Sequence, residues 1–261
     1  MTANLLSEYR KFFSTRMWWL LLIIMVLYMG LTAAALAFTF SPGVSGEMGM
    51  PSGSAVSTVY TTAASFGYIF PALIGVLSIT GEYRHKTITN TLLGTPQRGK
   101  MLVAKMIAGI PMGLMYGVAG TLGCVGLGAI ALNANGVDPL LGQASTWAII
   151  GRSVLAITLW LLVGVGIGAL IPNQVAAIVT LLVFTQFIEP IARMALPMAS
   201  WGENIAKFLP GSVGDAIAGG SFYSMMGTEL LPLWAGAILL TSYAVIFAVI
   251  GRYTTLRKDI S

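Results

Sequence analysis

Long apolar runs dominate the chain, and short polar segments separate them. The hydrocarbon core of a bilayer is about 30 Å thick, so an α-helix needs roughly 20 apolar residues to cross it. Six windows meet this requirement, and we predict a membrane-spanning helix in each: residues 17–40, 59–80, 101–132, 147–170, 175–196 and 230–250. The predicted fold class is an all-α membrane protein with a single transmembrane domain over residues 1–261.

The segment before the first window, residues 1–16, is patterned as an amphipathic helix. Apolar side chains fall on one face and polar ones on the other, with Leu5, Leu6, Tyr9, Phe12 and Phe13 facing away from Glu8, Lys11 and Ser14. Such a helix lies in the membrane interface. A signal peptide cleaved near Ala35-Leu36-Ala37 is the alternative, but the patterned segment and the continuation of the apolar run to Phe40 favour an uncleaved helix.

The polar loop of residues 81–100 contains the signals of a short helix. Thr87 is a helix-capping residue, Gly94 ends the helix, and Pro96 prevents its continuation. The apolar face of this helix consists of Ile88, Leu92 and Leu93. Exposed apolar residues on a projecting loop favour docking to another protein, and a lipid-facing interfacial helix is the alternative.

The connection formed by residues 197–229 is long and not plainly polar. It divides at Pro210-Gly211 into two short helical pieces, residues 201–209 and 212–219. These pieces fit external half-helices that lie between spans five and six and dip into the outer leaflet. A folded external loop is the alternative.

The charge distribution predicts the orientation of the spans. Only 9% of the residues are charged and 56% are hydrophobic, whereas soluble domains average about 25% charged residues. All fourteen Lys and Arg residues except Arg152, Arg193 and Lys207 lie near the N-terminus, between spans two and three or at the start of span three, or near the C-terminus. An even number of spans places these regions on one side, which the positive-inside rule makes cytoplasmic. This pattern lacks the basic, base-reading face of a nucleic-acid-binding protein, so we expect no nucleic-acid partner.

Residues suited to catalysis or metal binding are scarce. Cys124 and His85 are the only cysteine and the only histidine, which excludes an intramolecular disulfide, a His-rich metal site and a Ser-His-Asp triad within the membrane. Residues 94–101 nearly match a phosphate-binding loop, but Met101 stands where Ser or Thr must ligate magnesium. We therefore predict that the chain is not an enzyme and binds no metal or cofactor itself.

Besides Lys105, which lies at the start of the third window and is counted with the basic loop before it, three charged residues fall inside the predicted spans: Arg152, Glu189 and Arg193. Such residues are candidates for function because a charge in the membrane is costly. Glu189 and Arg193 are four residues apart and can pair on one helix face. Arg152 and Glu189 lie at similar depths in adjacent spans, so an interhelical bridge between them is the alternative pairing. A paired charge that pins two helices and a contact with a transported substrate both remain open.

Glycines recur at four-residue spacing in two spans. They are Gly109, Gly113 and Gly117 in the third window and Gly164 and Gly168 in the fourth. Small residues at this spacing let helix backbones approach closely in the membrane. We predict tight helix packing at these positions.

The chain resembles the ABC-2 type permeases, the membrane subunits of bacterial ATP-binding-cassette exporters. The resemblance lies in the sequence GEYRHKTITNTLL at residues 81–93, followed by Thr95-Pro96 and Arg98, and in the layout of the six spans. It implies a multi-pass protein of the bacterial cytoplasmic membrane with both termini in the cytoplasm. It also implies that the loop is a coupling helix that fits a cleft on a cytosolic ATPase, through Glu82, Arg84, Thr87, Ile88, Leu92 and Leu93.

The same resemblance implies the partners. Two ATPase subunits, which hold ATP and magnesium, would act on two permease subunits, and the second permease would be identical to the first. Few charges in the spans suit hydrophobic or amphipathic cargo such as a drug, peptide, lipid or glycolipid. The alternative function is a stand-alone transporter or channel driven by an ion gradient, for which Glu189 is the one strong intramembrane candidate.

Overall fold

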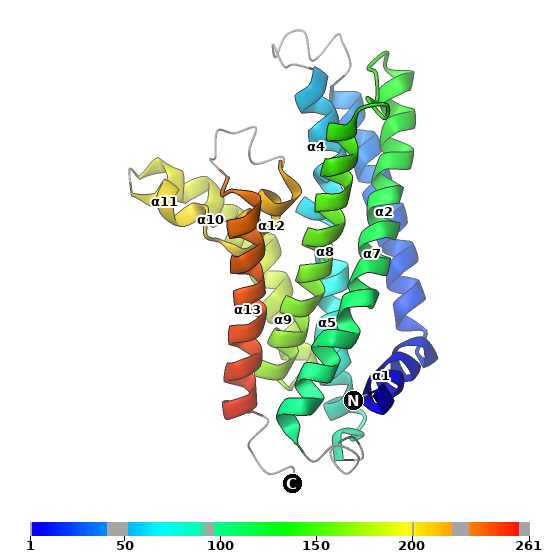
Figure 1. Cartoon of the computed structure of the whole chain (residues 1–261). Helices are drawn as coiled ribbons and strands as arrows, with labels where there is room; N and C mark the ends of the chain where they lie inside the picture. The colour runs from blue at the N-terminus through cyan, green and yellow to red at the C-terminus, as the bar shows by residue number, and fades with distance from the viewer. Residues whose placement is uncertain are drawn as a thin grey trace.

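In the computed structural model, the protein is a bundle of long helices (Figure 1). The structure describes residues 2–40, 52–89, 91, 97–199, 201–220 and 230–255, and it contains no strand within these ranges. The α-helices are α1 (Thr2–Ser14), α2 (Met17–Thr39), α4 (Ser52–Ser65), α5 (Ile69–Arg84), α7 (Arg98–Ala134), α8 (Ala144–Leu170), α9 (Gln174–Val183), α10 (Glu189–Ala195), α11 (Gly202–Ala206), α12 (Pro210–Ala218) and α13 (Leu233–Thr254).

Within the described residues, six helical stretches are long and apolar enough to cross a membrane, which confirms the predicted number of spans. They are Met17–Thr39, Gly53–Arg84, Arg98–Ala134, Ala144–Leu170, Gln174–Met198 and Leu233–Thr254. The second and third are longer than the sequence windows. At 1.5 Å per residue, the 37 residues of α7 extend over about 55 Å. Helix α7 therefore exceeds the hydrocarbon thickness and continues beyond it.

Helix α8 lies at the centre of the bundle and packs against α5, α7 and α13. Glycines allow these contacts, as their spacing predicts. A Cβ at Gly164 would collide with the carbonyl oxygen of Ala72, and one at Gly113 would lie 2.9 Å from the Cα of Thr158. The α5–α8 and α7–α8 backbones could not approach so closely with larger residues.

Helix α2 packs mainly on α7. Helix α1 lies across one end of the bundle, which is also the end at which the last turn of α13 lies (Figure 1). We call this end the α1 end. Helix α1 lies within the segment predicted as an amphipathic helix, and its placement at a membrane surface stays a prediction.

The fifth span is interrupted before Glu189. Residues Phe184–Ile188 form a π-helical turn, after which α10 begins with Glu189 and Pro190. Pro190 has no N–H to donate, and its ring crowds the carbonyl of Gln186 four residues earlier, so the regular α-helical hydrogen-bond pattern is disturbed here. The wider π turn accommodates this change.

The chain after the fifth span forms the short helices α11 and α12. Pro210 does not separate them, as the sequence suggested, but opens α12, a position that suits proline because the first helical N–H has no partner within the helix. Gly219 ends α12 with a φ of 88°. Residues 221–229 of the predicted external segment lie outside the described residues.

Candidate functional site

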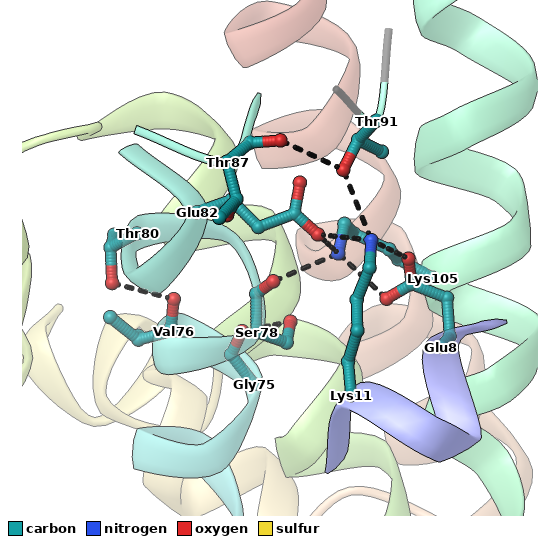
Figure 2. A network of polar contacts seen from close by, with 10 residues as sticks. All are labelled: Glu8, Lys11, Gly75, Val76, Ser78, Thr80, Glu82, Thr87, Thr91 and Lys105. Carbon is teal, nitrogen blue, oxygen red and sulfur yellow. Dashed lines mark hydrogen bonds and ion pairs between the residues drawn. The ribbon is translucent and has the colours of Figure 1, made fainter. Parts of the chain in front are cut away.

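Four charged side chains from three helices meet at the α1 end (Figure 2). Glu8 and Lys11 come from α1, Glu82 from the last turn of α5, and Lys105 from α7. We call them the four-charge cluster. Two carboxylates and two ammonium groups balance in charge, and every one of the four takes part in at least two ion pairs.

Lys105 is the most buried member, with 1% of its side chain exposed. Its Nζ donates to Glu8 Oε2 at 2.7 Å, to Glu82 Oε1 at 2.6 Å and to the carbonyl oxygen of Ser78 at 2.9 Å. An ammonium has three N–H donors, so all of them are used. A buried charge is tolerated only with this degree of pairing, and the cluster therefore fixes α7 to α1 and α5.

Lys11 connects the same carboxylates to the segment that follows α5. Its Nζ donates to Glu82 Oε1 at 2.8 Å, to Glu8 Oε1 at 3.0 Å and to the hydroxyl of Thr91 at 3.1 Å. Burial alone would lower the pKa of Lys11, but the hydrogen bonds and charges of Glu82 and Glu8 outweigh burial and raise this pKa above 10.5. Lys11 is therefore charged at neutral pH.

The residues predicted to couple to an ATPase occupy different environments. Arg84 is exposed, and its guanidinium lies 3.4 Å from the side-chain oxygen of Gln174. Thr87 donates its backbone N–H to the carbonyl of Glu82 and accepts from the hydroxyl of Thr91. Glu82 is buried in the four-charge cluster, so it acts inside the bundle.

The predicted exposed docking face is wrong at Ile88. Its side chain is 2% exposed and belongs to the hydrophobic core, because the chain after α5 folds back against the bundle. Leu92 and Leu93, the other two members of that face, lie outside the described residues.

A second buried cluster lies where the fifth span meets α12. Arg193 on α10 donates through Nη2 to Asp215 Oδ2 at 2.9 Å and through Nε to the hydroxyl of Ser212 at 2.7 Å. The hydroxyl of Ser65 donates to the other oxygen of Asp215 at 2.7 Å. This arginine cluster joins α4, α10 and α12.

Glu189 belongs to the same cluster. Its Oε1 accepts backbone N–H groups from Gly211 and Ser212 at the start of α12, where the helix dipole favours a negative charge. Arg193 Nε lies 3.5 Å from the same oxygen, so the predicted local pair is formed. The predicted bridge to Arg152 is wrong, because within the described residues Glu189 pairs with Arg193 and Arg152 is exposed.

Sequence reasoning missed the strongest partner in this cluster. Asp215 is 1% exposed and binds Arg193 more closely than Glu189 does. A lone carboxylate within the otherwise apolar and small-residue helix α12 was the available signal. Lys105 was likewise counted as one more basic residue on the cytoplasmic face, although it follows apolar and small residues at the start of a span.

No protein-family model matches the sequence, and no curated protein matches it. The resemblance to ABC-2 type permeases therefore rests on residues 81–98 and on the order of the spans.

Proposed function

We propose that the chain is the membrane-spanning permease subunit of an ATP-driven ABC exporter. Two copies would form a pathway for a hydrophobic or amphipathic cargo, and a separate cytosolic ATPase would drive them. In this proposal the α1 end faces the cytoplasm of a bacterium, and the chain lies in its cytoplasmic membrane.

The observation that carries the proposal is the four-charge cluster. An ATPase beneath the membrane needs a rigid connection through which its movement reaches the spans. Thr91 lies in the segment expected to contact the ATPase, and its hydroxyl accepts a hydrogen bond from Lys11. Lys11 pairs with Glu82, and Glu82 pairs with Lys105. A displacement of this segment would therefore move α1, α5 and α7 together, because a buried ionic network has few alternative arrangements.

The exposed apolar surface is consistent with a partner in the membrane. The spans formed by α2, by α9 with α10, and by α13 have less than a third of their residues buried in the single chain, whereas the spans that contain α5 and α8 are mostly buried. Lipid or the second permease subunit would cover these exposed sides.

The direct test is purification from the native host in a gentle detergent, followed by mass spectrometry of the bound proteins. We expect an ATPase with nucleotide-binding motifs at equal stoichiometry, and ATP hydrolysis that increases when the permease is present. Replacing both Leu92 and Leu93 with Asp should remove the ATPase without unfolding the bundle. The matched control, Leu141→Asp, introduces the same charge at a leucine that is exposed in the loop between α7 and α8.

Orientation has its own measurement. Cys124 is fully buried, so the native chain offers a low background for thiol labelling. We expect His85→Cys to be protected from a membrane-impermeant maleimide in intact cells and Leu141→Cys to react. The reverse pattern would refute the proposed orientation.

A second candidate function is transport driven by an ion gradient. The arginine cluster favours it, because Glu189 and Asp215 bring two carboxylates to one guanidinium in a span, and buried titratable groups of this kind carry protons or cations in transporters. Transport by the purified chain alone in liposomes, dependent on a pH gradient and abolished by Glu189→Gln, would favour this function over the exporter.

A further inference from the structure

An open cavity of about 610 Å³ lies at the α1 end, between the start of α7 and the last turn of α13 (Figure 1). Three of its lining residues are cationic: Arg98 and Lys100 on α7 and Arg252 on α13. The side chains of Lys100 and Arg252 are exposed. No acidic side chain lines this cavity within the part of the chain that the structure describes. Two spans therefore bring positive charge together at one point.

The guanidinium of Arg252 reaches across from α13 to the first turn of α7. A Cβ built on Gly99 would lie 2.9 Å from Arg252 Cζ, so the guanidinium lies directly against the backbone of the residue between Arg98 and Lys100. The positive end of the helix dipole of α7 is at this turn, which makes the position unfavourable for a cation. Neither Lys100 nor Arg252 forms an ion pair with a described residue. An anion between these two side chains would relieve their repulsion.

The cavity continues into exposed apolar side chains of both spans. Val103 and Tyr253 line the cavity and are 47% and 59% exposed. Ile107 follows Val103 by four residues on α7, and Ile250 and Ile246 precede Tyr253 by three and seven residues on α13. These spacings place each set on one helix face, and all three isoleucines are exposed. Two apolar faces therefore lead from the cationic cavity towards the middle of the spans.

We propose that this cavity binds the phosphate group of an anionic phospholipid, whose acyl chains lie along the exposed faces of α7 and α13. The phosphate would accept hydrogen bonds from the ammonium of Lys100 and from the guanidinium of Arg252, which can present two parallel N–H groups to it. Basic pockets at the ends of membrane helices bind anionic head groups in this way.

The apolar faces favour a lipid over a soluble phosphate, since only a lipid uses both parts of the site. The charge favours an anionic lipid over a zwitterionic one. A quaternary ammonium next to the phosphate would lie among the cations of the cavity and offset the attraction.

This inference goes beyond the proposed exporter function and does not depend on it. The cavity belongs to one chain, and lipid binding there requires no ATPase. Absence of an ATPase would leave the lipid site intact, and absence of lipid binding would leave the exporter proposal intact.

The test uses the full chain in nanodiscs made of equal parts phosphatidylglycerol and phosphatidylcholine with the same acyl chains. Both lipids carry the phosphate, but only phosphatidylglycerol has a net negative charge. Native mass spectrometry after release into detergent should show bound phosphatidylglycerol enriched roughly 25-fold, from about fivefold for each of the two exposed cations. Equal retention of the two lipids would overturn the proposal.

Three single variants locate the site. Lys100→Gln and Arg252→Gln each remove one cation from the cavity, and each should reduce the enrichment about fivefold. The double variant should retain the two lipids equally. Both positions are exposed, so the melting temperatures should match that of the wild type. Arg10→Gln is the matched control, because Arg10 is an exposed cation on α1 that does not line this cavity. It changes the net charge equally and should retain the full enrichment, whereas equal effects of Arg10→Gln and Arg252→Gln would refute the site.

Inorganic phosphate distinguishes the lipid from a soluble anion, because it carries the same group without acyl chains. The measurement is repeated in phosphate and in chloride buffers of equal ionic strength. The same enrichment of phosphatidylglycerol in both buffers would support the lipid site. Enrichment that is lost in phosphate alone would assign the cavity to a soluble phosphate and overturn the lipid assignment.

Discussion

Replacing Lys105 with methionine tests whether the four-charge cluster holds the α1 end together. Methionine nearly matches the length and volume of lysine but has no charge and no N–H. The variant therefore removes two ion pairs and the hydrogen bond to Ser78. It leaves Glu8 and Glu82 with Lys11 as their only ammonium partner in the cluster.

The expected loss is large because the lysine and both carboxylates are buried. Their side chains are exposed by 1%, 10% and 7% respectively. Removing one partner from a buried ion pair costs about 3–5 kcal/mol, since the remaining charge stays buried without compensation. We expect a decrease of this size in the free energy of unfolding, or roughly 6–20 °C in melting temperature for a chain of this length.

The assay is thermal unfolding of the purified chain in detergent, followed by tryptophan fluorescence. Lys100→Met is the control, because it removes an exposed lysine from the same helix, one and a half turns earlier. A double variant, Lys105→Met with Glu82→Gln, should recover part of the loss because it removes the uncompensated carboxylate. Equal melting temperatures for Lys105→Met and Lys100→Met would refute the structural role of the cluster.

Three further predictions follow from other parts of the structure. Gly164→Ala should destabilise the bundle by about 1–3 kcal/mol because the added Cβ meets the backbone of Ala72. The control, Gly126→Ala, should be neutral or stabilising in the same melting assay because nothing lies within 4 Å of its added Cβ. The raised pKa of Lys11 contributes stability that is complete below pH 10.5 and is lost as the pH rises through the folded-state pKa. The difference in unfolding free energy between wild type and Lys11→Met should therefore stay constant up to pH 10.5 and shrink above it. A difference that grows above this pH would contradict the pairing. Asp215→Asn should cost about 3–5 kcal/mol because it breaks the close pair with Arg193, while Glu189→Gln should cost less than about 1 kcal/mol since its oxygen still accepts the N–H groups of α12. A loss in chemical denaturation that is as large for Glu189→Gln as for Asp215→Asn would contradict this ranking of the two counter-ions.

The spans were predictable because crossing a bilayer is a requirement on length and hydrophobicity, which are local properties of the sequence. Glycine spacing likewise predicted close packing at Gly113 and Gly164. It did not identify the partner helices, because a small residue permits an approach without specifying what approaches.

The two clusters were harder to predict because their members are distant in sequence. Glu8 and Lys105 are separated by 97 residues, and Ser65 and Asp215 by 150. Helical periodicity relates residues three or four apart, which is why the pair of Glu189 and Arg193 was foreseen and the contact with Asp215 was not. Ile88 was expected on an exposed face because the sequence does not reveal that the chain after α5 folds back onto the bundle.

The distance in sequence between the members of the four-charge cluster also bears on how the chain is made. The 97 residues between Glu8 and Lys105 take a ribosome about 5–20 s to synthesise at 5–20 residues per second. In the later part of that interval α1 has left the ribosome, but Lys105, the buried partner of Glu8 on α7, has not been made. Helix α1 must therefore wait until α7 has been made, and only then can Glu8 dock on Lys105. A nascent chain arrested before Lys105 should expose α1 to protease, and one arrested well after it should protect α1.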